Sequence, residues 1–367
     1  MENDFKPKVG IVISTMNRSD FVIRQLEYYA KVKSPHPVYI GDASNEEHKK
    51  KLQAAIEKLS ESLAVRYYAQ PEKCTILESR IELYEKVKEE YCAFSGDDDY
   101  QIPNSLTKCA EFLERNPDYS SASGHSVSFR LVNNSVYGEL RRLADYPRQQ
   151  IEAATAAQRL VDLMTKFHVT EFSVQKTKYL IEAWSQSHPI KDWTFGYDVF
   201  PSAISAISGK SKIVDCLSLI RQLDNPKMAA QNSFEWITKK DWGSSFEIFN
   251  EILAQKISIV DGIDLDKARK IPKQAIWSYL RVWLPYQYAK TYGIRNTGDK
   301  KPSDHLFRKL RLRLGQKLPW LKNIYLRAAY SLPNSPRKIY YEVMQPSFPY
   351  YEDFQRVYNS FTGKYRT

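Results

Sequence analysis

Tyr91-Cys92-Ala93-Phe94-Ser95-Gly96-Asp97-Asp98-Asp99 is the stretch of this chain that decides the fold. Its apolar half predicts a short buried strand, and the glycine predicts the turn that closes it. Three consecutive carboxylates repel one another, so they indicate either a divalent cation opposite them or a solvated acidic turn. Mg²⁺ and Mn²⁺ prefer oxygen ligands, and Mg²⁺ is commonly held by one or two carboxylates together with substrate phosphates.

Strand-like and helix-like stretches alternate around these aspartates, from Lys8 to about Asp224. The first ones follow one another at 9–13, 20–31, 37–42, 46–63, 64–68, 76–90 and 91–95. This alternation predicts an α/β, Rossmann-like, mostly parallel sheet with helices on both faces. Ligands of such sheets bind beyond the carboxyl ends of the strands. Because Thr15 and Asp42 also follow strands, we expect three polar loops to converge on one binding crevice.

Length and composition indicate an ordinary globular protein of two domains, with 367 residues, 43% hydrophobic and 26% charged. The predicted division is a sheet domain over 7–224 and a helical C-terminal region over 225–367. Its helix-like stretches lie at 233–255, 265–292, 303–317 and 320–331. The four cysteines lack CxxC spacing, and we find neither a secretory signal nor a bilayer-length apolar run, which favours a reduced, cytoplasmic setting without structural zinc.

The positive charge is concentrated in one segment, residues 300–338. It holds eleven Lys and Arg and one acid, Asp304, so it accounts for +10 of the net charge of +11. Apolar side chains from Leu306 to Leu318 share one helical arc, and a basic amphipathic helix of this kind is typical of an anionic membrane surface. Alternatively, the arc packs on the protein. Nucleic acid is the weaker third interpretation, because no nucleic-acid module accompanies the charge.

Four short motifs occur in a fixed order along the first part of the chain: Thr15-Met16-Asn17-Arg18, Asp42-Ala43-Ser44, Ser79-Arg80 and 95–105. In this order the chain up to about Gln222 resembles the nucleotide-sugar-dependent glycosyltransferases of the A-type fold, in the large family 2-like group. One departure stands out. Gly96 occupies the place of the first aspartate of the acidic motif, which leaves open whether Asp97 or Asp98 takes that role.

The resemblance implies a sugar nucleotide donor, with a UDP-sugar favoured, and Mn²⁺ or Mg²⁺ held by Asp97 and Asp99 with Asp98 close behind. The residues that it implies at the nucleotide sugar are Thr15, Asn17, Arg18, Asp42, Arg80, Asp97, Asp98 and Arg221. Cationic groups and a metal neutralise a departing diphosphate. Taken singly, each motif has a simpler explanation: Asp42 as a solvated cap, and Arg80 as a helix residue facing water.

For the catalytic base of an inverting transfer, the best match is Asp198, followed by the apolar helix 202–208. A carboxylate at a helix N-terminus is stabilised as the anion, as a ready base must be. Capping of that helix is the alternative role, and Asp192 is the local competitor. His125 and His168 are candidates for a third metal ligand or an acceptor contact, although a surface or core histidine is the commoner case.

The sequence therefore predicts a metal-dependent glycosyltransferase that extends a glycan or lipid-linked acceptor while bound peripherally to the cytoplasmic face of a membrane. Two alternatives stay open. The first is a catalytically inactive binding or scaffold protein with the same fold, which the departure at Gly96 favours. The second is nucleic-acid binding through residues 300–338. The C-terminal helices equally allow a homo-oligomer.

Overall fold

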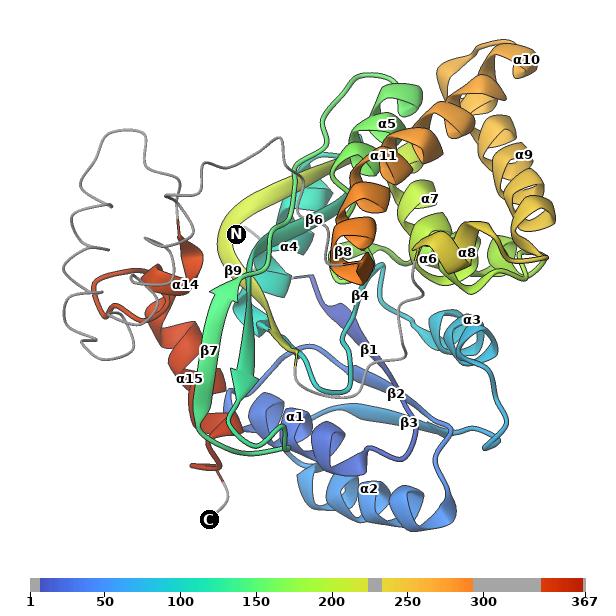
Figure 1. The fold of residues 1–367 in the computed structure, drawn as a ribbon. Coiled ribbons are helices and arrows are strands. Elements are labelled where there is room, and N and C mark those ends of the chain that lie inside the picture. The colour runs from blue at the N-terminus through green and yellow to red at the C-terminus, as the bar shows by residue number, and fades with distance from the viewer. Residues whose placement is uncertain (1–6, 224–232, 293–337, 366–367) are drawn as a thin grey trace, which may run out of the picture.

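The computed structural model describes residues 7–223, 233–292 and 338–365 (Figure 1). Within these ranges nine strands form one mixed sheet in the order β3-β2-β1-β4-β8-β6-β9-β5, and β7 pairs with β6. The strands are β1 Val9–Thr15, β2 Val38–Asp42, β3 Val65–Ala69, β4 Tyr91–Phe94, β5 Tyr100–Gln101, β6 Tyr119–Leu131, β7 Leu140–Asp145, β8 Val174–Lys176 and β9 Lys210–Gln222. The predicted α/β class is confirmed.

The parallel part of the sheet, β3-β2-β1-β4, is the part that the sequence pattern predicted. Successive side chains of a strand point to opposite faces. On β1, Val9, Ile11 and Ile13 therefore enter one core and Val12 enters the other. Both faces are apolar because both are covered, as in other parallel sheets.

Helices cover the two faces and extend beyond the sheet (Figure 1). They are α1 Ser19–Lys31, α2 Glu46–Leu59, α3 Ile76–Lys86, α4 Pro103–Arg115, α5 Ala156–Thr165, α6 Thr177–Ser187, the π-helix η1 Thr194–Val199, α7 Phe200–Ser208, α8 Ser233–Ile237, α9 Trp242–Asp261, α10 Leu265–Ala268, α11 Lys270–Tyr292, α14 Ile339–Glu342 and α15 Tyr351–Phe361. Helices α1, α2 and α4 contribute to the core on one side of the sheet, and α3 and α6 to the core on the other.

A second large core lies among α5, η1, α7, α9 and α11. The last helix does not join it. Phe354, Val357 and Phe361 of α15 return to the core around β1, and α15 packs against α1. The predicted boundary near residue 224 stays a prediction, and packing does not follow it simply, because both cores draw on residues from both sides of it.

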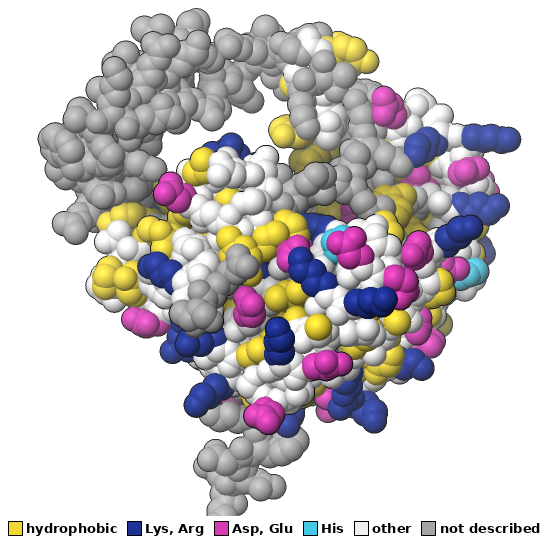
Figure 2. Space-filling model, turned by 90° about the horizontal axis from the view of Figure 1, so that it is seen from below, with side chains coloured by type: hydrophobic (Ala, Val, Ile, Leu, Met, Phe, Trp, Pro, Cys, Tyr) yellow, Lys and Arg dark blue, Asp and Glu magenta, His cyan; other side chains and the backbone are white. Residues whose placement is uncertain are grey.

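Some predicted helices are shorter or divided in the structure. The predicted helix 76–90 ends at Lys86, 233–255 divides into α8 and α9, and 265–292 divides into α10 and α11. The basic amphipathic stretches 303–317 and 320–331 lie outside the described residues. On the face shown in Figure 2, the described Lys and Arg side chains are interspersed with Asp and Glu. None of the described helices combines the length and apolarity that a membrane span requires.

Candidate active site

The predicted polar loops meet at one edge of the sheet. Thr15 and Asp42 end β1 and β2 and are register partners. The aspartate turn follows β4, which pairs with β1 on its other side. The Thr15 hydroxyl Oγ1 donates to Asp97 Oδ2 at 3.1 Å, and so joins the first loop to the acidic turn. This convergence is what parallel neighbouring strands impose on residues at their carboxyl ends.

Asn17 fastens the first loop to the second. Its φ of 56° is in the left-handed region, which asparagine tolerates better than most residues. Its backbone N–H donates to Ser44 Oγ at 2.7 Å, and its side-chain Oδ1 accepts from the backbone N–H of Asn45 at 2.9 Å. Asn45 is also the N-cap of α2. The turn after β1 therefore holds the start of α2 in place.

Asp42 is a turn cap, and it is fully buried rather than solvated. Its Oδ1 accepts from the Ser44 N–H at 2.9 Å, and its Oδ2 accepts from the Tyr67 hydroxyl at 3.0 Å. Burial, and then the Asp42 charge, raise the pKa of Tyr67. Asp42 thus shapes the turn at the end of β2.

Asp97 and Asp98 share one cation. Arg18 Nη1 lies 2.9 Å from Asp97 Oδ1, and its Nη2 lies 2.9 Å from Asp98 Oδ2. Both aspartates are 8% exposed. Burial, and then the neighbouring Asp98 charge, raise the pKa of Asp97 to about 7, although Arg18 and Thr15 act in the opposite direction. Arg18 therefore does not offset the combined effect of burial and of the neighbouring carboxylate on Asp97.

Asp99 takes a different direction from the other two aspartates. It is fully buried, and its Oδ2 accepts from Arg221 Nε at 2.8 Å while its Oδ1 accepts from the Gln222 N–H at 3.1 Å. Arg221 continues to the Tyr146 hydroxyl at 2.8 Å and stacks over Phe172 at 4.2 Å. The pair therefore ties the acidic turn to the end of β9.

The acidic turn fits a divalent cation through two of its carboxylates. In the described ranges, no three His, Cys, Asp or Glu side chains are grouped to hold a metal ion. Mg²⁺ needs only one or two carboxylates when substrate phosphates complete its shell. Asp97 and Asp98, adjacent and crowded with negative charge, supply such hard oxygen donors. Asp99 is less well placed for this role, because its side chain is fully buried, whereas Asp97 and Asp98 each retain some exposure to solvent.

Arg80 is buried, so the alternative that it faces water is wrong. Its side chain forms a salt bridge with Glu171, its Nε donates to Ser14 Oγ at 3.0 Å, and its guanidinium stacks over Phe94 at 3.4 Å. The Tyr84 hydroxyl also donates to Glu171, at 2.5 Å. Arg80 thus contacts the end of β1 through Ser14, and its charge is matched by the buried carboxylate of Glu171.

Asp198 does not begin a helix. It lies within η1, a π-helix that continues into α7, so the predicted stabilisation by a helix N-terminus is wrong. Its side chain reaches solvent, while the dense protein around it desolvates the carboxylate. This burial, with the negative charge of Glu171, raises the pKa of Asp198 to about 6, and Arg221 and Arg80 act in the opposite direction. Such π-turns are frequent at functional sites.

Asp192, the competitor for the role of base, has a structural position. Its Oδ1 accepts from the Phe195 N–H at 2.9 Å and from Trp236 Nε1 at 2.8 Å. It therefore holds the start of η1 against α8. Of the two aspartates, Asp198 alone has a solvent-accessible side chain.

Comparison with solved structures shows which fold places these groups together. The chain is similar to residues 1–349 of TarS from S. aureus in complex with UDP-GlcNAc, with a TM-score of 0.51 and 13% identity over 77% of this chain and 76% of that one. The chain has a nucleotide-sugar glycosyltransferase fold. A further match is the mannosyltransferase PcManGT from Pyrobaculum calidifontis in complex with GDP-Man and Mn²⁺, with a TM-score of 0.37 and 11% identity over 89% and 85% of the two chains. No protein-family model and no curated protein matches the chain.

The departure of this glycosyltransferase fold at Gly96 has a steric reason. A Cβ atom added at Gly96 would lie 2.8 Å from Asp99 Oδ2 and 3.3 Å from Asp98 Oδ1. With a side chain at residue 96, the carboxylates of Asp98 and Asp99 would have to shift from their present positions. The substitution therefore shapes the acidic turn and does not by itself indicate a lost activity.

Sequence analysis missed the residues that hold the acidic turn from behind. Arg24 is fully buried on α1 and donates through Nη2 to the Asp98 carbonyl at 2.9 Å and through Nη1 to Gln222 Oε1 at 2.8 Å. Gln25 donates to the Gly96 carbonyl. Glu171, the partner of Arg80, was also missed. A single acid within the strand-like stretch 169–174 was the available signal for it.

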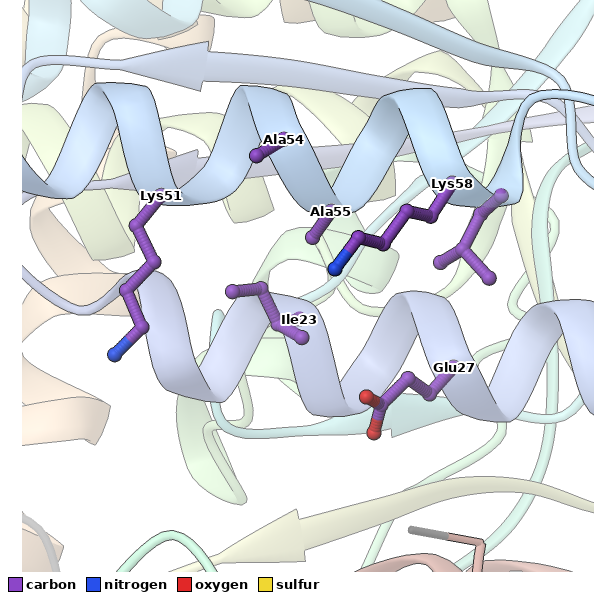
Figure 3. A pocket seen from close by; sticks show the side chains of 7 residues that line it. Ile23, Glu27, Lys51, Ala54, Ala55 and Lys58 are labelled. Carbon is purple, nitrogen blue, oxygen red and sulfur yellow. The ribbon is translucent and has the colours of Figure 1, made fainter. Parts of the chain in front are cut away.

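The two candidate histidines and a cavity on the helical layer take no part in the acidic turn. His125 Nε2 lies 3.4 Å from Asp215, and neither His125 nor His168 belongs to a metal-holding group among the described residues. A cavity of about 380 Å³ lies between α1 and α2 (Figure 3). Alanines and aliphatic stems line much of it, and none of the site residues described above does, so we assign it no part in the site.

Proposed function

We propose that this protein transfers a sugar from a nucleotide diphosphate sugar, with a UDP-sugar favoured, to a glycan or lipid-linked acceptor. The supporting observation is the position of Asp198. It is an accessible carboxylate whose pKa is raised to about 6, and it lies in the electrostatic reach of Arg80 and Arg221 at the edge of a glycosyltransferase fold. A base with this pKa is ionised at neutral pH and still accepts a proton readily.

The donor would lie across the ends of β1, β2 and β4. The turns at Asn17 and Asp42 would shape the place for the nucleoside, and Thr15 and Arg18 would face its phosphates. Asp97 and Asp98 would hold Mn²⁺ or Mg²⁺, so we move the second proposed metal contact from Asp99 to Asp98. A cation bound there would neutralise the charge of the departing diphosphate. Arg80 and Arg221, each paired with a buried carboxylate, would contribute through their field rather than as free phosphate ligands.

In the proposed inverting step, an acceptor hydroxyl attacks the anomeric carbon from the side opposite the diphosphate. The new carbon–oxygen bond forms as the bond to the diphosphate breaks, and the diphosphate leaves with both bonding electrons. Asp198 takes the proton of the hydroxyl. Removing a positioned base of this kind typically costs about 10²–10⁴-fold in rate.

Calorimetry and donor hydrolysis test this proposal separately. UDP- and GDP-sugars are titrated with and without Mn²⁺ into the wild type, Asp97→Asn/Asp98→Asn and Asp198→Asn. We expect the double variant to lose Mn²⁺-dependent binding and Asp198→Asn to bind the donor but lose hydrolysis. Asp266→Asn, on the exposed side of α10, is the matched control. Equal binding and hydrolysis by all the variants would refute the proposal.

An inactive binding protein is the alternative function. It predicts that the wild type binds the donor and hydrolyses it no faster than Asp198→Asn does. Nucleic-acid binding predicts instead salt-dependent retention of DNA or RNA that is lost on truncation at Thr297.

We further propose that residues 300–338 attach the protein to the cytoplasmic face of an anionic membrane, and that it self-associates. Cosedimentation with vesicles that contain phosphatidylserine, compared with purely zwitterionic vesicles, tests the first proposal. Sedimentation equilibrium tests the second. Equal binding to both kinds of vesicle, or a monomer at all concentrations, would refute the respective proposal.

A further inference from the structure

A second cavity, of about 290 Å³, contains an arginine without an acidic partner. It is lined by Arg148, Lys166, His168, Phe167 and Trp283, among others. The Nε and Nη1 atoms of Arg148 are buried and have no hydrogen-bond partner in the described part of the chain, while its Nη2 donates to Ser173 Oγ. Arg80 and Arg221, by contrast, each pair with a carboxylate. Burying a cation with two unpaired donors costs folding free energy unless a bound group accepts their hydrogen bonds.

The other polar groups of this cavity leave its charge positive. Lys166 lies exposed at the rim. Burial, and then the charge of Arg148, lower the pKa of His168 to about 3, so the ring is neutral, and its Nδ1 has no partner among the described residues. The fork of a guanidinium matches the oxygens of a phosphate or carboxylate. The unused donors therefore favour an oxyanion.

The ring of Tyr279 connects the wall of the cavity with the surroundings of the proposed base. The Tyr279 ring contacts both Phe167 and Trp283, at centroid distances of 5.3 and 6.0 Å. Burial, and then the charge of Asp198, raise the pKa of Tyr279, so the carboxylate acts electrostatically on that ring. Arg148 and Arg221 also act on each other electrostatically. A molecule with its charged group at Arg148 and its body against the aromatic wall would extend toward Asp198.

We propose that the Arg148 cavity binds an oxyanion carried by the acceptor, so that the acceptor is a negatively charged glycan. The identification of the ligand as an acceptor rests on the proposed function, but the anion site itself does not. The aromatic side chains suit the apolar face of a sugar ring, and the buried fork selects a phosphate or carboxylate attached to it. This site is separate from the two carboxylates proposed to hold the cation and the donor diphosphate.

Calorimetry with inorganic phosphate, glucose 6-phosphate and glucuronate tests the site on the full chain. We expect Arg148→Gln to weaken the tightest-binding probe by about tenfold or more, and Lys166→Gln to weaken it less. Arg142→Gln, an exposed arginine of β7, is the matched control and should leave binding unchanged. The stronger of the phosphate and carboxylate probes identifies the oxyanion. Binding that is equal in the wild type and both cavity variants would overturn the inference.

Titration with UDP separates this inference from the proposed function. We expect UDP affinity to be the same in the wild type and Arg148→Gln, and phosphate to bind in the presence of saturating UDP. If UDP displaces phosphate and loses affinity in Arg148→Gln, the cavity belongs to the donor and the inference is wrong. If no sugar nucleotide binds but phosphate binding still depends on Arg148, the anion site stands and the proposed function fails.

Discussion

Removing the Arg221 guanidinium should test whether Asp99 is a structural or a ligand-binding carboxylate. Asp99 is fully buried and has Arg221 Nε at 2.8 Å and the Gln222 N–H at 3.1 Å. In Arg221→Met the carboxylate keeps the backbone donor but loses the guanidinium that contacts it. Leaving one member of a buried pair uncompensated typically costs about 3–5 kcal/mol. The wide, partly apolar contact of Arg221 with Phe172 is largely retained by methionine, so packing should contribute little to the loss.

The reverse substitution, Asp99→Asn, should cost less, about 1–3 kcal/mol. Arg221 would still donate to Tyr146 and stack over Phe172, and its side chain is 16% exposed. In the double variant, the free energy of unfolding should fall by about 2 kcal/mol less than the sum of the two single losses. The reason is that neither charge then remains buried without the other.

Urea denaturation followed by circular dichroism, without nucleotide or metal, measures these free energies of unfolding. Arg269→Gln, which breaks the exposed pair with Glu251, is the control and should change stability far less. A loss below about 0.5 kcal/mol in Arg221→Met, or strictly additive single losses, would contradict a structural pair. Asp99 would then be available to a ligand, as the sequence had predicted.

Three further predictions concern the base, the first loop and the second cavity. Donor hydrolysis should fall about tenfold per pH unit below pH 6, because the pKa of Asp198 is raised to about 6 and its protonated form accepts no proton, and a flat profile from pH 4.5 to 8 would exclude this base. Asn17→Ala should lower the free energy of unfolding by about 1–2 kcal/mol and Asn17→Gly by less, since only glycine adopts the φ of 56° freely; equal losses in urea denaturation would argue against backbone strain. Arg148→Met should raise the free energy of unfolding by about 1–2 kcal/mol by removing a buried cation with two unused donors, and a clear loss in the same assay would show that the guanidinium is satisfied within the protein.

The sheet edge was predictable because its signals are local. The periodicity of strands and helices can be read from a few residues. Parallel pairing of β1 with β2 and β4 then brings Thr15, Asp42 and the aspartates to one edge of the sheet. Pairings across the chain leave no such signal. Arg221 lies 122 residues after Asp99, and Glu171 lies 91 residues after Arg80. The local sequence around these residues does not identify their partners.

The π-helix was also out of reach of sequence analysis. The pattern around Asp198 indicated a helix that begins near Pro201, because proline is common in the first turn of helices. In the structure the chain is already helical at Thr194, and tertiary packing of Phe195 and Val199 in the second core sustains it. Asp198 therefore lies in the middle of a helical segment and not at a helix end. Its pKa is raised by burial and by Glu171 instead of being lowered by a helix N-terminus.

The return of α15 to the first core joins segments that lie far apart in the sequence. Ser360 exchanges a hydrogen bond with the Tyr100 hydroxyl at 3.0 Å and reaches the carbonyl of Arg24 at 3.5 Å, across 260 and 336 residues of sequence. During synthesis on the ribosome, α1, which holds the acidic turn through Arg24, therefore lacks part of its packing until α15 has emerged, 336 residues later. A nascent chain arrested before α15 would expose the apolar surface of the first core that α15 covers. We expect chaperones that recognise apolar surfaces to bind such a chain.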